Sequence, residues 1–324
     1  MIIVKFSGGL GNQMFQYAMY KGLERKYPQI KVKADISFYN NDPAHHGFEL
    51  EHVFDLSNRG LIAYSNPLEY KQVTGEWEPQ EWIVKGGFAE KVWAWLNART
   101  RQRAIGKNGL YRVQEEFANE ILTEQRREER TREILDQIDH LDISKNWYID
   151  GYWQDERYFC DILENLRGDF IFSSLTDADD YKLEERINSE DSVAIHVRRG
   201  DYVGTRYDLH LMNYYKNALE LITQKSNGNR LKLYVFSEDS EYVRENFKWL
   251  GEYEIIDWHV GSESFRDMQI MSLCKYQIIA NSSFSIWAGY LNCCPDKLIC
   301  YPAQYTDELP SFSRKQLGWV CVDL

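Results

Sequence analysis

Apolar runs and helical periods alternate along the second half of the chain and predict an α/β protein. Five short apolar runs are typical of buried strands: 192–197, 231–236, 253–258, 276–280 and 297–301. Between the runs, apolar residues recur every three or four positions, as at 211, 214, 218 and 222, which is the period of a helix with one buried face. Nearly continuous apolar strands that alternate with helices predict a parallel, doubly wound sheet.

A similar pattern opens the chain. Residues 1–6, MIIVKF, predict a strand, residues 7–13, SGGLGNQ, a glycine-rich turn, and residues 14–27 an amphipathic helix. Further strands are predicted at 31–35 and 147–150, and the dense mixed charge of 116–139 indicates a solvated helix, whereas 40–115 shows no strong period. We therefore expect two Rossmann-like domains facing across a cleft, with boundaries at 1–160 and 161–324.

Composition narrows the function classes. The 324 residues are 44% hydrophobic and carry a net charge of −12, which disfavours nucleic acid as a partner. The apolar start meets Lys5 at once, and no stretch approaches the roughly 20 apolar residues of a membrane-spanning helix, so we expect a cytoplasmic protein. The six cysteines form no CxxC pair, which predicts reduced, structural thiols.

Charged residues follow the predicted strand 192–197 in the stretch HVRRGDY. His196, Arg198, Arg199 and Asp201 lie where ligands bind in parallel α/β sheets, outside the carboxyl end of a strand. Two guanidinium groups there suit a phosphate or pyrophosphate, and Asp201 is placed to orient one of them. A salt-bridged surface turn is the alternative. An adhesive Arg-Gly-Asp is disfavoured, because that use needs an exposed extracellular loop.

Polar residues also follow two neighbouring strands. Ser237 and Asp239 come after 231–236, where they either cap the next helix or contact a ribose or purine. Asn281, Ser282 and Ser283 come after 276–280, where they offer an anion site at a helix N-terminus or an ordinary cap. Because carboxyl ends of parallel strands share one edge, we expect all three strand ends to meet around one nucleotide diphosphate.

The glycine-rich turn near the N-terminus fits no standard phosphate motif. No Gly-Lys-Ser/Thr follows it, and Met14 stands where a dinucleotide fingerprint has its third glycine. A structural tight turn explains it without a ligand. In the functional interpretation, Gly9 and Gly11 let the backbone approach a ligand, while Asn12 supplies an amide.

Five motifs occur in order over most of the chain and together carry a family resemblance. They are GGLGNQMFQYA, GYWQDERYF, HVRRGDY, VFSEDSEYV and IIANSSFSIWAGYL. The sequence resembles the bacterial α-1,2-fucosyltransferases. The resemblance implies a GT-B fold and a galactoside 2-α-L-fucosyltransferase of lipopolysaccharide or oligosaccharide biosynthesis. Its donor would be GDP-β-L-fucose, and fucose would pass with inversion to O2 of a terminal β-galactoside acceptor.

The resemblance also implies roles for the site residues. Arg198 would carry the pyrophosphate and act in catalysis, and Asn12 would lie near the transferred sugar. Asp239 and the run Asn281 to Ser285 would hold guanosine and phosphates. The expected GDP-fucose site comprises Gly9, Gly11, His196, Arg198, Arg199, Asp201, Ser237, Asp239, Asn281, Ser282, Ser283 and Phe284.

The acceptor side is less defined. His46 and Glu49, in the stretch HHGFELEH, are the candidates for the catalytic base and His46 also for acceptor binding, although surface or packing roles explain either residue. Tyr152, Trp153 and Gln154 are expected to stack on and hydrogen-bond the acceptor sugar, with core packing as the alternative.

No metal and no cofactor beyond the donor substrate is expected, because arginines would stand in place of the ion. The stretch DADD at 177–180 has Asp-x-Asp spacing, but it precedes the sheet and predicts a helix start. Alternatives are a transferase for another GDP-sugar such as GDP-mannose and a non-catalytic carbohydrate-binding protein. A nicotinamide oxidoreductase is disfavoured by the broken glycine pattern. A lipid-linked acceptor would place the protein peripherally at a membrane.

Overall fold

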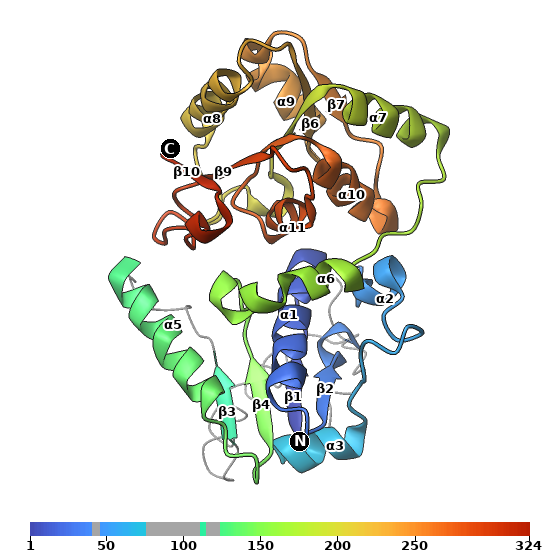
Figure 1. Ribbon diagram of the computed structural model, residues 1–324, viewed down its shortest axis with the longest axis vertical. Coiled ribbons are helices and arrows are strands. Elements are labelled where there is room, and N and C mark those ends of the chain that lie inside the picture. The colour runs from blue at the N-terminus through green and yellow to red at the C-terminus, as the bar shows by residue number, and fades with distance from the viewer. Residues whose placement is uncertain (41–45, 76–110, 115–123) are drawn as a thin grey trace, which may run out of the picture. The chain divides into compact units, whose positions relative to one another are not determined.

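The computed structural model describes residues 1–40, 46–75, 111–114 and 124–324. Contacts divide the chain into two compact units (Figure 1). The first comprises Met1–Asn119 and Glu128–Ile162, and the second comprises Glu120–Arg127 and Leu163–Leu324. Among the described residues, no helix has both the length and the apolar character needed to cross a membrane.

The second unit is built on a parallel sheet of six strands in the order β10-β9-β8-β5-β6-β7. Its strands are β5 Asp191–His196, β6 Leu231–Phe236, β7 Glu254–Ile256, β8 Tyr276–Ile278, β9 Leu298–Pro302 and β10 Val320–Val322. Because β5 pairs with both β6 and β8, the chain order reverses between β5 and β8. The five predicted strands and the doubly wound sheet are confirmed, and β10 is an addition.

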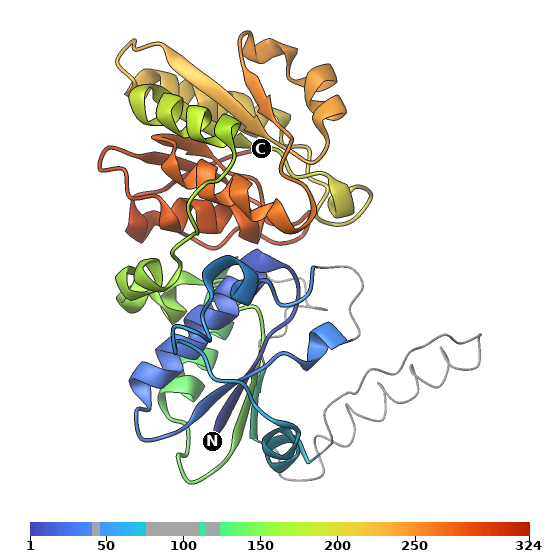
Figure 2. The same cartoon turned by 90° about the vertical axis from the view of Figure 1, so that its right-hand side faces the viewer.

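Helices cover both faces of this sheet (Figure 2). The residues Tyr214, Ala218 and Ile222 recur along one side of α8 and are buried with Val193 and Ile195 of β5, as the sequence period predicts. Helix α9 joins this core, and α7, α10 and α11 cover the opposite face. The helices of the unit are α6 Leu163–Asp169, α7 Ala178–Ser189, α8 Met212–Lys225, α9 Ser240–Asn246, α10 Phe265–Leu273 and α11 Ser283–Leu291.

The first unit has a parallel sheet in the order β2-β1-β4-β3. Its strands are β1 Ile2–Lys5, β2 Val32–Asp35, β3 Tyr111–Gln114 and β4 Trp147–Asp150, and its helices are α1 Leu10–Lys26, α2 Glu49–Phe54 and α3 Pro67–Thr74, with residues 128–139 of α5 Glu124–Asp139. The strands predicted in 1–6, 31–35 and 147–150 are confirmed. Much of the segment 40–115, and the start of the helix predicted at 116–139, lie outside the described residues.

Helix α1 begins earlier than its sequence predicts. The glycine turn was expected to run through residue 13, but Gly8 makes the turn with a φ of 78° and the helix begins at Leu10. The Glu49 carboxylate accepts the Leu10 N–H at 2.9 Å, and Gln13 Oε1 accepts the Glu49 N–H at 2.8 Å. The cap therefore comes from α2, far along the chain, where no local pattern could reveal it.

Candidate functional site

Three strand ends meet at one edge of the second sheet, as the sequence predicts. Ligands of doubly wound sheets bind where the strand order reverses, which here lies between the carboxyl ends of β5 and β8. The Tyr202 hydroxyl, after β5, donates to the Asn281 carbonyl, after β8, at 3.4 Å. Glu238, after β6, reaches the backbone N–H of Arg199 at 3.1 Å. The candidate site is thus a single cluster.

Arg198 presents its guanidinium at this cluster. It forms ion pairs with Asp201, on the same turn, and with Glu238 at 3.2 Å, and it lies over the Tyr202 ring at 5.2 Å. The side chain of Arg198 is 31% exposed and that of Asp201 is 62% exposed. A fixed cation with exposed, displaceable partners can bind an anion that arrives from solvent.

Arg199 points to a different environment. It pairs with Asp208 at 2.9 Å and lies over the Tyr242 ring of α9 at 4.2 Å. This geometry gives the second arginine a packing role beside the first, because its guanidinium already has an ion partner and an aromatic face.

His196 is a neutral imidazole at the end of β5. Burial, with a smaller contribution from the neighbouring Arg198 charge, lowers the pKa of His196 to about 3. Its ring lies 5.9 Å from that of Phe284 in α11, and its buried Nδ1 has no hydrogen-bond partner within the described residues. The site therefore has a buried polar nitrogen beside its cation.

The residues after β6 cap α9. Ser237 Oγ accepts the Asp239 N–H at 3.1 Å, and the Asp239 carboxylate accepts the Tyr242 N–H at 3.0 Å. This geometry matches the capping alternative for Asp239, the N-cap residue of α9, while Ser237 holds the backbone N–H of that residue. Glu238, between them, is the one that reaches the arginines, and nothing in the sequence pattern singled it out.

The residues after β8 have different tasks. Asn281 is buried and its side-chain amide donates to the Tyr207 and Tyr305 carbonyls at 3.0 and 2.9 Å, so it ties the loops after β5 and β9 together. Ser282 is the N-cap residue of α11, but its side chain makes no capping hydrogen bond, and Ser283 is the first helical residue. A helix N-terminus without a side-chain cap has backbone N–H groups to offer an anion.

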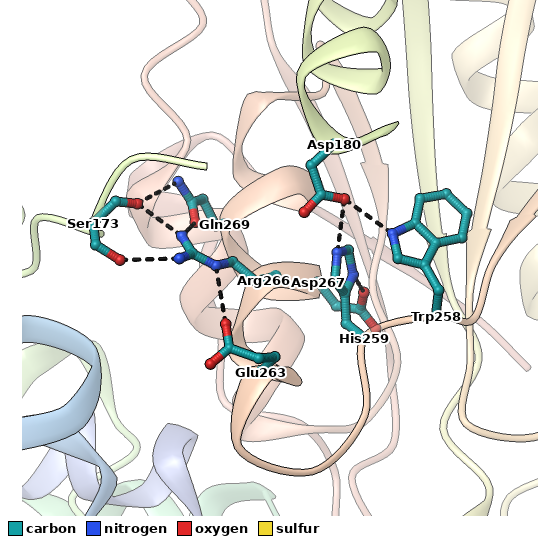
Figure 3. A network of polar contacts seen from close by, with 8 residues as sticks. All are labelled: Ser173, Asp180, Trp258, His259, Glu263, Arg266, Asp267 and Gln269. Atoms are coloured by element: carbon teal, nitrogen blue, oxygen red, sulfur yellow. Dashed lines mark hydrogen bonds and ion pairs between the residues drawn. The ribbon is translucent and has the colours of Figure 1, made fainter. Parts of the chain in front are cut away.

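A buried charge network lies beyond β7 (Figure 3). His259 bridges two carboxylates, Asp180 of α7 at 2.8 Å and Asp267 of α10 at 2.6 Å, and Trp258 Nε1 donates to Asp180 at 2.9 Å. Burial alone would lower the pKa of His259, but the two carboxylates outweigh it and raise the pKa above 6.5. Burial raises the pKa of Asp267 to about 6. Nothing in the local sequence pattern of these residues predicts the network.

On the other side of α10, Arg266 continues the network toward the segment before α7. It donates to the Ser173 carbonyl at 2.8 Å and to Gln269 Oε1 at 2.7 Å, and it pairs with Glu263 at 3.4 Å (Figure 3). The first turn of α10 is thus held to the chain that precedes β5 from both sides, which fixes the helix next to β8.

In the first unit, the amide pair Asn12 and Gln154 comes together. Gln154 Nε2 donates to Asn12 Oδ1 at 3.1 Å. Gly9 is the N-cap residue of α1, and Gly11 is buried in its first turn. The candidates Asn12 and Gln154 thus share one hydrogen bond at the α1 N-terminus.

The remaining acceptor-side candidates lie in different environments. His46 is exposed, whereas Glu49 caps α1. Tyr152 is 47% exposed, but Trp153 is fully buried and packs edge-on against Tyr158 with ring centroids 5.3 Å apart. The burial of Trp153 matches the core-packing alternative.

The Asp-x-Asp spacing at 177–180 is a helix start, as the sequence predicts. Asp177 is the N-cap of α7 and accepts the Asp179 N–H at 2.8 Å, and Asp179 pairs with Lys182. Asp180 turns inward to His259. Across residues 1–40, 46–75, 111–114 and 124–324, no group of three or more His, Cys, Asp or Glu side chains is arranged to hold a metal ion.

Comparison with known proteins decides the family. The model of "Glycosyl transferase family 11" matches residues 107–323, which span the whole candidate cluster of the second unit. The chain belongs to glycosyl transferase family 11. The protein is therefore a glycosyltransferase. Its resemblance to fucosyltransferases is confirmed at the level of the family.

Two curated relatives match this chain over nearly its full length. It is 28% identical to an "Alpha-1,2-colitosyltransferase" of Escherichia coli, over 99% of both chains. It is 25% identical to "O-antigen biosynthesis glycosyltransferase WbnK" of Escherichia coli, over 92% of this chain and 93% of the relative.

A solved structure of NodZ alpha-1,6-fucosyltransferase, soaked with GDP-fucose, is similar in fold. It matches with a TM-score of 0.50 at 13% identity, over 90% of this chain and 91% of that one. The structure of fucosyltransferase NodZ from Bradyrhizobium matches equally well, with a TM-score of 0.50 at 12% identity, over 89% of this chain and 90% of that one. The predicted GT-B fold class is thereby confirmed.

Proposed function

We propose that this chain transfers L-fucose from GDP-β-L-fucose to O2 of a terminal β-galactoside with inversion, giving an α-1,2 linkage. The observation that carries the proposal is the partly exposed guanidinium of Arg198 at the carboxyl end of β5, next to the reversal of strand order. A fixed cation at that position suits the diphosphate of a nucleotide sugar. The relative described as an alpha-1,2-colitosyltransferase supports the α-1,2 linkage.

Arg198 has the central part in the proposed chemistry. The bond between fucose C1 and the β-phosphate oxygen breaks as galactose O2 bonds to C1 from the opposite face, and GDP leaves with growing negative charge. Donors that meet this charge where it develops stabilise the transition state more than the ground state. The backbone N–H groups at the start of α11 would add donors, and the neutral His196 would contribute its unpartnered Nδ1. We propose that this set serves without a metal ion.

The proton of galactose O2 must pass to a base. His46 and Glu49 are the residues that we propose for this step. Asn12, with Gln154 beside it, is proposed to contact a sugar. Glu49 already caps α1, so a loss of activity in a Glu49 variant needs a matching measurement of stability.

A second candidate donor follows from the curated relative. Colitosyl transfer to the same kind of hydroxyl is favoured by the 28% identity to the alpha-1,2-colitosyltransferase over nearly the whole chain. Colitose is fucose without its 3-hydroxyl. A site that hydrogen-bonds this hydroxyl rejects the analogue that lacks it by several orders of magnitude. Parallel assays with the two donors therefore separate the candidates sharply.

The decisive experiment is a transfer assay with the purified chain. GDP-fucose, GDP-colitose and GDP-mannose are each incubated with a panel of β-galactosides in the presence of EDTA, and the new linkage is located by NMR. We expect product from GDP-fucose with the sugar on O2. Product from GDP-colitose or GDP-mannose alone would replace the proposed donor. Activity only after addition of Mn²⁺ would overturn the metal-free part.

A binding assay addresses the non-catalytic alternative. A carbohydrate-binding protein has no use for a cation at the strand end, whereas a GDP-sugar transferase is stabilised by its product GDP. We expect GDP to raise the thermal unfolding midpoint. Binding of β-galactosides without any response to GDP would favour the carbohydrate-binding alternative.

A further inference from the structure

Glu238 makes contacts that its two neighbours do not. Ser237 accepts the Asp239 N–H and Asp239 caps α9, whereas the Glu238 side chain points to the turn that follows β5. Its Oε1 accepts the backbone N–H of Arg199 at 3.1 Å and lies 3.2 Å from Nη1 of Arg198. One carboxylate oxygen therefore holds both the backbone of the turn and the guanidinium.

The shape of the turn fits this carboxylate. Gly200 has a φ of +32°, and a Cβ at that position would lie 2.7 Å from Glu238 Oε1. A side chain at residue 200 would therefore push the carboxylate away from both arginines. Helix α9 strengthens the same junction, since Tyr242 lies beneath the Arg199 guanidinium. The connection from β6 to α9 thus fixes both arginines.

The geometry points to Glu238 as a positioning residue, which holds the Arg198 guanidinium at the end of β5 in readiness for the diphosphate. This inference rests on the proposed function, because it takes Arg198 as the diphosphate contact. An arginine side chain has several rotatable bonds, and a guanidinium that is already oriented loses less conformational entropy when its ligand binds. Asp201 holds Arg198 as well, but it lies on the turn itself and cannot anchor the turn to the next strand.

The test compares three variants of the full chain by calorimetry with GDP and with inorganic pyrophosphate. Glu238→Ala removes the contacts, and Glu238→Gln keeps an oxygen that can accept from Arg199 and Arg198. Glu241→Gln is the matched control, because Glu241 is an exposed residue in the first turn of α9. We expect Glu238→Ala to raise the Kd for both probes about ten-fold or more, equivalent to about 1.4 kcal/mol. The Gln variant should stay within about three-fold of the original chain, and the control should be unchanged.

A second variant protects the test against misfolding of Glu238→Ala. Gly200→Ala displaces the carboxylate without altering any charge, and it should weaken binding of both probes in a chain whose thermal midpoint shows that it is folded. Undiminished binding in folded Glu238→Ala, or in folded Gly200→Ala, overturns the inference.

The possible outcomes show whether the proposed function, the role of Glu238 or both are wrong. An unaltered chain that binds GDP and pyrophosphate but does not transfer fucose contradicts the proposed function alone, and the Glu238 comparison still decides the inference. An unaltered chain that binds neither probe overturns both, because Arg198 is then no diphosphate contact. A binding chain in which Glu238→Ala behaves as the original overturns the inference alone.

Discussion

The first strand of each unit leads into a polar turn, but the two turns use their polar groups differently. After β1, Gly8 turns the chain and the Glu49 carboxylate caps α1. The Gln13 side chain donates to the Gly8 carbonyl and accepts the Glu49 N–H. After β5, the Arg198 guanidinium stays partly exposed, and its partners Asp201 and Glu238 are exposed as well. The first turn uses its polar groups to build a helix, and the second keeps a charge accessible.

This difference shows how a fold separates a structural turn from a binding turn. A buried cap is satisfied once the chain folds, so its loss changes stability. An exposed ion pair contributes little to stability, because water screens it. Its arginine can therefore exchange a carboxylate partner for a ligand with little loss of folding free energy. Substitutions at the two turns should therefore change different measured quantities.

The largest effect is expected from Arg198→Ala. Loss of one donor to the leaving diphosphate should lower kcat by about 100 to 1,000 fold, with little change in the thermal midpoint. Arg206→Ala, an exposed change of the same charge in the loop after β5, is the control and should keep its activity. A transfer assay together with thermal unfolding makes the comparison. Substantial activity in Arg198→Ala would contradict the assignment of the turn after β5 as a binding turn.

The corresponding change at the first turn is Glu49→Ala. Loss of the α1 cap should lower the free energy of unfolding by about 1 kcal/mol, measured by urea denaturation. Glu49→Gln keeps an oxygen for the Leu10 N–H and should lose less. A stable Glu49→Gln chain with full transfer activity would exclude Glu49 as the base and leave His46.

Arg199→Ala sharpens the contrast between the adjacent arginines. Its guanidinium is held by Asp208 and the Tyr242 ring, so its loss should lower the free energy of unfolding by about 1 kcal/mol. Activity should fall less than in Arg198→Ala. Denaturation and transfer assays on both variants test this, and an activity loss equal to that of Arg198→Ala with unchanged stability would contradict the packing role.

The smallest effect concerns pH and the network beyond β7. The raised pKa of His259 means that its ion pair with Asp180 stabilises the fold below pH 6.5, and that this contribution is lost as pH rises through the folded-state pKa of His259. The stability difference between the original chain and His259→Gln should therefore shrink between pH 6.5 and 9. Urea denaturation across that range measures it, and a constant difference would show that the charge of His259 has no part.

Much of the second unit could be predicted from sequence, because local pattern determines it. Apolar runs buried on both faces gave the strands, and the helical period gave α8. Parallel strands then brought His196, Arg198 and Asn281 to one edge by topology alone. The use of these residues as a donor site stays a proposal.

What escaped prediction depends on contacts between distant positions. The cap of α1 is made by Glu49, the anchor of the β5 turn by Glu238, and the bridge between α7 and α10 by His259. None of these residues differs in its local pattern from an ordinary surface residue. Trp153 shows the converse, since an aromatic residue in a polar loop folded into the core.

The two carboxylates around Arg198 also bear on how the site responds to salt. Because Asp201 and Glu238 already neutralise the guanidinium in the unliganded chain, a diphosphate would take the place of the exposed Asp201 carboxylate while Glu238 keeps its contact with Arg198. Little charge is newly neutralised in that exchange. Affinity should consequently depend less on ionic strength than at a bare arginine, and the freed Asp201 carboxylate would repel the anion that remains after transfer. Glu238 would thus ready the site for its ligand, and Asp201 would speed release of the product.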